Sequence, residues 1–127
     1  MVQKGQEEIG IYSMHELGIV FHIIDSLEKV GKENELKTIQ SVTLELGEVS
    51  AVVHDELLHC WKWASSKHDI VRDAKMYIEP IKAYTKCFDC GEQYETVEHG
   101  RICPYCNSEK TYLVVGDEIN IKSIEAV

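Results

Sequence analysis

The chain has 127 residues, with 13 basic and 22 acidic side chains and a formal net charge of −9 at pH 7. This length suits one compact domain, or a small domain that carries a module held together by a metal. The acidic charge disfavours nucleic acid as a partner, because phosphates are also negative. The sequence contains no apolar run suited to spanning a bilayer, and its first eight residues are too polar for a secretory signal. We therefore expect a cytoplasmic protein that binds neither membranes nor nucleic acid.

The apolar pattern predicts two helices in the first half of the chain. Apolar residues recur at helical spacing between Met14 and Lys32, and Gly31 is placed to end this helix. A second helix is predicted from His54 to Lys67. The side chains of this helix that we expect to fill core space are Cys60, Trp61 and Trp63.

Three strands complete the expected domain. Apolar residues alternate with polar ones from Val42 to Leu46, which is the pattern of a strand with one buried face. A second strand covers residues 76–81, where Pro80 indicates a strand end or a sheet edge. A closing strand begins at Ile119. This order predicts an α+β fold in which two helices pack on a small, mostly antiparallel sheet, with an inserted four-cysteine zinc-ribbon module.

Four of the five cysteines form two Cys-x-x-Cys pairs, Cys87 with Cys90 and Cys103 with Cys106. The loop between the pairs contains 12 residues, which is near the spacing of tetrahedral four-cysteine zinc sites. Two such pairs can bring their four sulfurs together around one ion. The fifth cysteine, Cys60, belongs to neither Cys-x-x-Cys pair, and an odd number of cysteines would be awkward in a secreted protein.

The residues around these pairs also favour a metal site. Gly91 and Asn107 directly follow the two pairs, and both residue types tolerate the positive φ that a tight turn needs. Pro104 stiffens the second pair. A redox-active pair would not need a second matching pair, and structural disulfides would need an oxidising compartment. We therefore predict a structural Zn²⁺ bound by four thiolates.

The motifs, taken together, resemble a known family. The sequence Met-His-Glu-Leu-Gly-Ile starts at Met14, a predicted strand ends in Leu-Glu-Leu-Gly-Glu at Glu48, and the cysteine pairs follow. In this order the chain resembles the HypA/HybF nickel metallochaperones of hydrogenase maturation, from Met14 to about Val127. The resemblance implies that the protein is not an enzyme and that it delivers Ni²⁺ to the large subunit of a nickel-iron hydrogenase.

The same resemblance implies the partners. It implies a HypB-type GTPase as accessory protein, with urease maturation proteins as alternative recipients of nickel. The chain has no Gly-x-x-x-x-Gly-Lys-Ser/Thr loop, so any dependence on GTP must come from that partner.

His15 is the principal nickel ligand that the resemblance implies, and Glu16 takes part through its backbone nitrogen, its side-chain charge, or both. A histidine at the second position of a free chain offers an amine, an amide nitrogen and an imidazole in adjacent chelate rings, and such a nitrogen-rich set suits Ni²⁺. Thirteen residues precede Met14 here, so its nitrogen is an amide. We therefore expect the full-length chain to bind nickel more weakly than a chain that begins at Met14.

The expected organisation follows from these two metal sites. Residues 1–13 form an N-terminal extension. Residues 14–82, completed by residues 114–127, form the nickel-binding α+β domain, and residues 83–113 form the zinc-binding module.

Other interpretations compete with this one. Ser13 and Glu16 also form a Ser-x-x-Glu capping box for a helix that begins there. Asp55 is more simply a helix cap, or a favourable charge beside the helix dipole, than an auxiliary nickel ligand. The alternative function is a zinc-ribbon protein-interaction adaptor without nickel transfer, which would be indifferent to His15→Ala. A zinc hydrolase is disfavoured, because four cysteines leave zinc no open coordination position.

Overall fold

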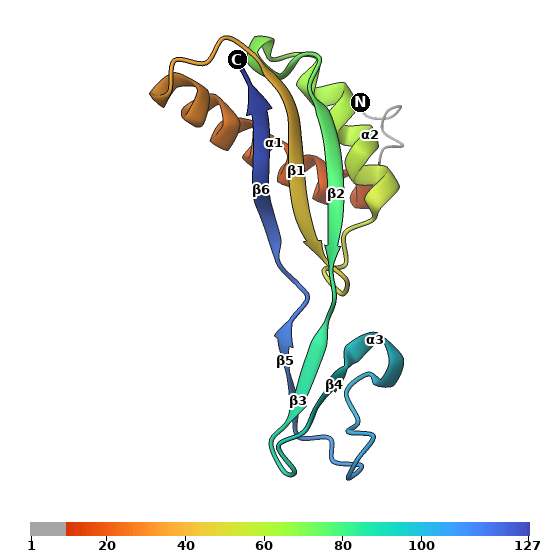
Figure 1. Cartoon of the computed structure of the whole chain (residues 1–127). Coiled ribbons are helices and arrows are strands. Elements are labelled where there is room, and N and C mark those ends of the chain that lie inside the picture. The colour runs from red at the N-terminus through yellow and green to blue at the C-terminus, as the bar shows by residue number, and fades with distance from the viewer. Residues whose placement is uncertain (1–9) are drawn as a thin grey trace. The chain divides into compact units, whose positions relative to one another are not determined.

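The computed structural model describes residues 10–127, with side chains described from His15 onward. Figure 1 labels the helices and strands. In chain order they are α1 (Gly10–Glu33), β1 (Ile39–Gly47), α2 (His54–Ser65), η2 (Asp69–Val71), β2 (Lys75–Ile81), β3 (Tyr84–Cys87), β4 (Gln93–Glu95), α3 (Thr96–His99), β5 (Thr111–Val115) and β6 (Ile119–Ala126).

The chain divides into two compact units. The first, called the helical unit here, contains the chain up to Thr43, then Val52–Tyr77 and Ile121–Val127. The second, called the cysteine unit, contains Leu44–Ala51 and Ile78–Asn120. Strands β1, β2 and β6 each pass from one unit into the other.

One sheet has the strand order β2-β1-β6, with β1 in the centre. Figure 1 shows β1 and β2 running in the same direction and β6 running the opposite way. The sheet thus contains one parallel pair, which α2 connects as a crossover. Pro80 lies in β2, an edge strand of this sheet, as the sequence predicts. The second sheet, β4-β3-β5, is antiparallel throughout, and the expected α+β class is confirmed.

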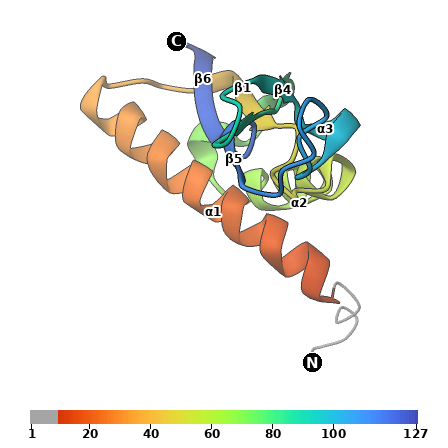
Figure 2. The same cartoon turned by 90° about the horizontal axis from the view of Figure 1, so that it is seen from below.

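Helices α1 and α2 of the helical unit lie on the same face of the β2-β1-β6 sheet (Figure 2). The buried apolar side chains of α1 recur at helical spacing, which is why one side of this helix faces the core. They are Val20, Ile23, Ile24 and Leu27. The strand pattern predicted for β1 is confirmed, because Val42, Leu44 and Leu46 are all fully buried. Among the helices of residues 10–127, none is both long enough and apolar enough to cross a membrane.

The predicted start of the first helix is wrong. Helix α1 begins at Gly10, so residues 10–13 of the expected extension form its first turn, while residues 1–9 lie outside the described part of the chain. Ser13 therefore stands inside the helix and is not its N-cap. The capping-box interpretation fails because Ser-x-x-Glu is a local pattern that a helix interior can also contain.

The helix ends one residue beyond the predicted Lys32, but Gly31 does not stop it and has another role. Helix α1 continues to Glu33, and a β-carbon on Gly31 would lie 2.2 Å from Cδ1 of Ile70, so the glycine permits close packing. The helix ends where Glu35 adopts a positive φ of 54°. The Leu36 N–H donates to the Gly31 carbonyl oxygen at 2.9 Å, which is the bonding of a Schellman motif.

Helix α2 buries one of its two tryptophans. Trp61 is 3% exposed, and its indole N–H donates to the Ala74 carbonyl oxygen at 2.9 Å. Trp63 is 51% exposed, so the expectation that it fills the core is wrong. Cys60 is half-buried. Residues two apart on a helix point to nearly opposite sides, so α2 can bury Trp61 or Trp63 against one core but not both.

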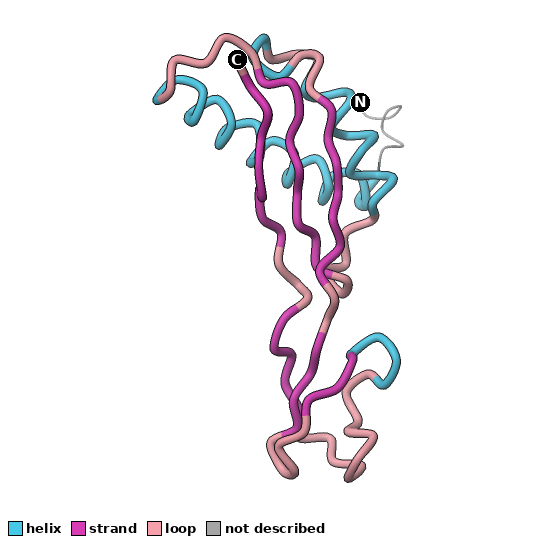
Figure 3. Tube along the Cα trace, viewed as in Figure 1, coloured by secondary structure: helices cyan, strands magenta, loops and turns pink. Residues whose placement is uncertain are grey.

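The cysteine unit has short strands joined by long loops (Figure 3). In its antiparallel sheet, Thr85 of β3 pairs with Tyr94 of β4 and with Leu113 of β5. The Thr85 hydroxyl contacts the Thr96 hydroxyl at 2.6 Å, which ties β3 to the start of α3. Sequence periodicity did not predict these strands, because each has only three to five residues.

Three segments of the cysteine unit pack backbone against backbone next to this sheet. The Val49 N–H donates to the Gly116 carbonyl oxygen at 2.9 Å, and the Glu48 carboxylate accepts the Ala83 N–H at 2.7 Å. A β-carbon on Gly116 would lie 2.3 Å from the β-carbon of Ala83. Only residues with small side chains or none therefore fit where Gly116 meets Ala83.

Candidate metal centres

The two cysteine pairs adopt the same backbone structure. The Gly91 N–H donates to the Cys87 carbonyl oxygen at 3.0 Å, and the Cys87 N–H donates to the Glu92 carbonyl oxygen at 3.0 Å. The second pair repeats these bonds sixteen positions later. The Asn107 N–H donates to the Cys103 carbonyl oxygen at 2.8 Å, and the Cys103 N–H donates to the Ser108 carbonyl oxygen at 3.0 Å. The two turns therefore repeat one hydrogen-bonding scheme.

Positive φ angles close both turns. Gly91 has a φ of 79° and Asn107 a φ of 63°, so the sequence prediction for these two positions is confirmed. Backbone amides also point at sulfur: the Cys90 N–H lies 3.5 Å from the Cys87 sulfur, and the Tyr105 N–H lies 3.4 Å from the Cys103 sulfur. Amide donors of this kind stabilise thiolates.

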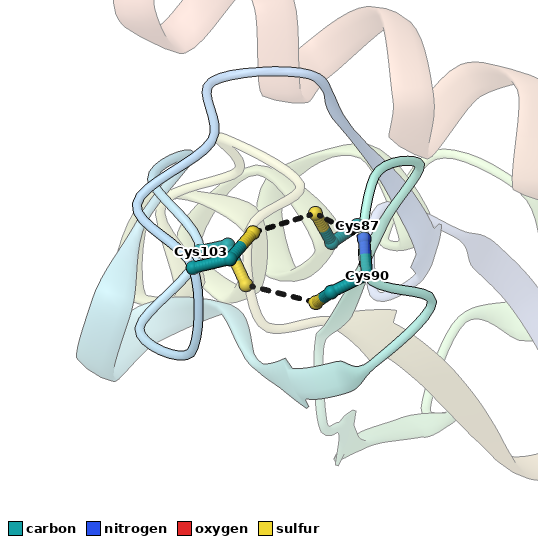
Figure 4. Close-up of side chains that lie close together, drawn as sticks. Cys87, Cys90 and Cys103 are labelled. Atoms are coloured by element: carbon teal, nitrogen blue, oxygen red, sulfur yellow. Dashed lines mark hydrogen bonds between the residues drawn. The ribbon is translucent and has the colours of Figure 1, made fainter.

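The four sulfurs converge on one point. The Cys87 and Cys106 sulfurs lie 3.6 Å apart, as do those of Cys90 and Cys103, and all four lie within 4.8 Å of one another. Figure 4 shows the side chains of Cys87, Cys90 and Cys103 turned toward a common centre. The first cysteine of each pair is buried and the second is exposed.

These distances fit a tetrahedral ion bound by four thiolates. With zinc-sulfur bonds of about 2.3 Å, a tetrahedron places its sulfurs roughly 3.8 Å apart. The observed separations of 3.6 Å are close to this value and far longer than a disulfide bond. The four cysteines are thus compatible with zinc in number, donor type and spacing.

The environment shifts the thiol pKa values in opposite directions. The Cys90 N–H is the main cause that lowers the pKa of the Cys87 thiol to about 7. The Ser108 N–H also acts to lower the pKa of the Cys106 thiol, but desolvation and the three neighbouring thiols outweigh it and raise this pKa to about 12. Four thiolates this close together would repel one another, which disfavours full ionisation of the set. A cation bound between them offsets that repulsion.

Hydrogen bonds and packing join the two turns. The Ser108 hydroxyl on the second turn donates to the Asp89 carboxylate on the first. Beneath the sulfurs, Cys87 and Cys103 pack with Tyr94 in a small buried cluster. The Tyr94 hydroxyl donates to the Gly100 carbonyl oxygen at 3.0 Å, so the loop between the pairs is also held.

The second candidate centre lies on α1 in the helical unit. The side chain of His15 is 57% exposed, whereas that of its neighbour Glu16 is 2% exposed. His15 Nδ1 and Glu16 Oε2 are 3.7 Å apart, which is too long for a hydrogen bond. His15 is therefore accessible to a metal ion from solution, and Glu16 faces inward.

The buried Glu16 carboxylate reaches the start of α2. Its Oε2 accepts the Val53 N–H at 3.0 Å, and Val53 is the N-cap residue of α2. The other oxygen, Oε1, is buried and has no hydrogen-bond partner among the described residues. Sequence reasoning missed this contact, because it joins residues 37 positions apart and leaves no local pattern.

Of the two structural roles expected for Asp55, helix cap and charge beside the helix dipole, the structure fits the second. Asp55 lies in the first turn of α2, where its negative charge interacts favourably with the helix dipole, but it is not the N-cap and Val53 has no side-chain cap.

Cys60 lies further along the same helix. Burial, then Glu56 and Glu16, raise the pKa of the Cys60 thiol, so this cysteine stays protonated at neutral pH.

Comparison with known proteins identifies the family. The family model described as HypA, the hydrogenase/urease nickel incorporation metallochaperone, matches residues 14–126. The chain belongs to the HypA family. The expected family is thus confirmed, and it is a family of metallochaperones and maturation factors, not of enzymes.

Curated relatives cover nearly the same length as this HypA-family chain. It is 32% identical over 111 residues to the hydrogenase maturation factor HypA of Chlorobium phaeobacteroides, which covers 87% of this chain and 97% of that protein. It is 28% identical over 112 residues to the hydrogenase maturation factor HybF of Klebsiella pneumoniae, which covers 88% and 98%.

Solved structures share the fold. A solution structure of the Ni metallochaperone HypA from Helicobacter pylori has a TM-score of 0.68 at 24% identity, over 88% of this chain and 97% of that one. A second solution structure of a HypA protein has a TM-score of 0.70 at 24% identity, over 90% and 97%.

Proposed function

We propose that this chain binds Ni²⁺ at its Met14–Glu16 segment and delivers it for the maturation of a nickel-iron hydrogenase, while Zn²⁺ held by four cysteines stabilises the cysteine unit. The observation that carries the proposal is the family match, which begins at residue 14, where the Met-His-Glu segment begins. The proposed zinc ligands are Cys87, Cys90, Cys103 and Cys106, whose sulfurs converge.

The helical structure of residues 10–16 bears directly on nickel binding. In a helix, only the first four N–H groups lack an intrahelical partner. Because α1 begins at Gly10, the amides of His15 and Glu16 lie within the hydrogen-bond ladder and are not available to a metal. In a chain that begins at Met14, the same amides belong to the first turn and have no helical partner.

We therefore propose that His15 is the principal ligand, that Glu16 contributes its backbone nitrogen, and that nickel binds tightly only when the turn formed by residues 10–13 is removed or unwound. The exposed position of His15 suits a carrier, because a carrier must release its ion to the next protein. Residues 14–82 with 114–127 would thus carry nickel, and residues 83–113 would carry zinc.

Nickel titration of the zinc-loaded chain tests this proposal. The full-length chain and a version that begins at Met14 are compared by calorimetry and absorption spectroscopy. We expect the Met14 version alone to bind nickel tightly with a nitrogen-rich, square-planar spectrum. His15→Ala should abolish this binding, whereas His22→Ala, at another exposed histidine of α1, should not.

Two results would overturn the proposal in different ways. Equal binding by both versions would place nickel at a site that does not need a free Met14 amine. No binding by either version would favour the adaptor function.

The proposed partners are a HypB-type GTPase and the hydrogenase large subunit, with urease maturation proteins as alternative recipients. The family description covers both hydrogenase and urease, which supports keeping both recipients. We further propose that the protein works in the cytoplasm, where reduced thiols remain available to zinc. Pull-down with each candidate recipient, with and without nickel, distinguishes them.

One observation favours the adaptor function as a second candidate. Phe88 and Tyr105, each within a cysteine pair, are 69% and 64% exposed, and such aromatic side chains are frequent in protein interfaces. An adaptor would keep its partner when His15 is replaced by alanine and lose it when Phe88 and Tyr105 are replaced. A nickel carrier would keep the partner and lose the metal under the first change.

A further inference from the structure

We propose that the side chain of Glu16 is not a nickel ligand but a positioning residue, which fixes the nickel-binding segment by accepting the backbone N–H at the start of α2. This inference rests on the proposed nickel site. It assigns the carboxylate of Glu16 a different role from its backbone nitrogen.

The first support is the direction of the side chain. Glu16 is 2% exposed and its neighbour His15 is 57% exposed, so the carboxylate and the imidazole face different environments. A cargo ion that must enter and leave from solution would meet the imidazole first. The carboxylate is committed elsewhere, at 3.0 Å from the Val53 nitrogen.

The second support is that α2, at the donor end of this bond, has no side-chain cap of its own. Val53 is the N-cap of α2, with φ −84° and ψ 114°, and it has no side-chain hydrogen bond that could cap the helix. In a capping box, the N–H of the N-cap residue is bonded by a carboxylate three positions later in the same helix. Here that N–H is bonded by a carboxylate from α1 instead. Glu16 therefore joins the second turn of α1 to the start of α2.

The third support is the unpaired oxygen. Glu16 Oε1 is buried without a partner among the described residues, and a buried unpaired carboxylate oxygen is costly. An alanine or leucine would avoid this cost but could not reach the Val53 N–H. Glu16 Oε2 lies 3.7 Å from His15 Nδ1, too far for a hydrogen bond, so the carboxylate would act on His15 through the backbone of α1, which its bond to Val53 holds in place.

The experiment uses the zinc-loaded chain that begins at Met14 and compares four single variants, together with the double variant Glu16→Ala/Val53→Pro, by nickel titration. Glu16→Ala removes the acceptor. Val53→Pro removes the donor, and the φ of Val53 is close to the value that proline requires. Glu16→Gln keeps an acceptor oxygen and loses only the charge. The control, Ile24→Val, perturbs the buried face of α1 without touching this bond.

If Glu16 acts by positioning, Glu16→Ala and Val53→Pro should each weaken nickel binding about 10-fold, the lower end of the effect of outer-shell changes. The double variant should be no weaker than either single one, because both remove the same bond. Glu16→Gln should recover most of the affinity, and the absorption spectrum of bound nickel should not change. The control should bind nickel like the parent chain.

Unchanged affinity in Val53→Pro together with a shifted spectrum in Glu16→Gln would overturn the proposal and make the carboxylate a direct ligand. Unchanged affinity in both Glu16→Ala and Val53→Pro would also overturn it. Hydrogen exchange of the Val53 amide checks, in the absence of nickel, that Glu16→Ala breaks the bond. If the parent chain itself binds no nickel, the proposed function fails, and faster exchange of Val53 in Glu16→Ala would show a purely structural bond.

Discussion

Gly47 and Gly116 meet backbone to backbone, so closely that a β-carbon on Gly47 would lie 2.0 Å from the carbonyl oxygen of Gly116. The neighbouring bonds hold this approach, since the Gly47 N–H donates to the Glu118 carbonyl oxygen at 2.7 Å. Neither segment can move away without breaking hydrogen bonds of the cysteine unit. The space for a side chain is therefore absent at Gly47.

Replacement of Gly47 by alanine should destabilise the protein. The added methyl group would press on backbone, not on a flexible side chain, and overpacking of this kind costs about 1–3 kcal/mol. Urea unfolding measures the loss. Gly18→Ala is the control, because nothing lies within 4 Å of the new methyl group and alanine favours a helix interior. It should gain about 0.5–1 kcal/mol. Equal stability of Gly47→Ala and the parent would contradict the close approach.

Glu35→Gly should stabilise the protein. Glu35 holds a φ of 54° at the end of α1, a conformation that costs a residue with a β-carbon roughly 1–2 kcal/mol and costs glycine little. Glycine also raises the entropy of the unfolded chain, so we expect a net gain of about 0.5–1 kcal/mol in urea unfolding. Glu33→Gly, two residues earlier and inside the helix, should instead lower stability. The prediction is wrong if both changes act in the same direction.

Cys87→Ser should release the proposed zinc ion. The Cys87 sulfur is 3.6 Å from that of Cys106 and is packed against Tyr94, so its loss opens the donor set and the buried cluster together. We expect one zinc per parent chain by elemental analysis and substantially less in the variant, with early loss of amide protection in the cysteine unit. Cys60→Ser, outside the cluster, should keep its zinc. Full zinc content in Cys87→Ser would exclude a four-thiolate site.

Stability should fall with rising pH in a way that depends on Cys60. Burial is the main cause that raises the pKa of its thiol above the ordinary value of 9.0, so the folded chain keeps this proton to higher pH than the unfolded chain does. The unfolded state then binds fewer protons above about pH 9, and the free energy of unfolding decreases as pH rises. Urea unfolding of parent and Cys60→Ala at pH 7.5 and 9.5 measures this effect. The parent should lose more stability, and equal losses would refute the assignment.

Local patterns were sufficient to predict the fold class and the turns around the cysteines. Alternation from Val42 to Leu46 identified a buried strand face, and Pro80 identified an edge strand. Gly91 and Asn107 identified the two positions of positive φ. Each of these depends on the residue itself and its near neighbours, which is what a single sequence contains. Metal binding by the cysteines and by His15 stays a prediction.

The errors arose where distant parts of the chain decide the structure. Gly31 resembled a helix stop, but it lies inside α1 against the side chain of Ile70, 39 positions later. Glu16 resembled part of a capping box, but its carboxylate bonds the N–H of Val53. Trp63 was expected in the core on its chemistry alone, although its spacing from Trp61 places the two on opposite sides of α2.

The unequal exposure of the cysteines determines how the candidate zinc site would be damaged. Cys90 and Cys106, one from each turn, are exposed, whereas Cys87 and Cys103 are buried. An oxidant or a competing chelator would therefore reach one sulfur of each turn first. Even after both exposed sulfurs are lost, each turn would keep one buried donor. Had both exposed cysteines belonged to the same turn, the same attack would have detached that turn completely.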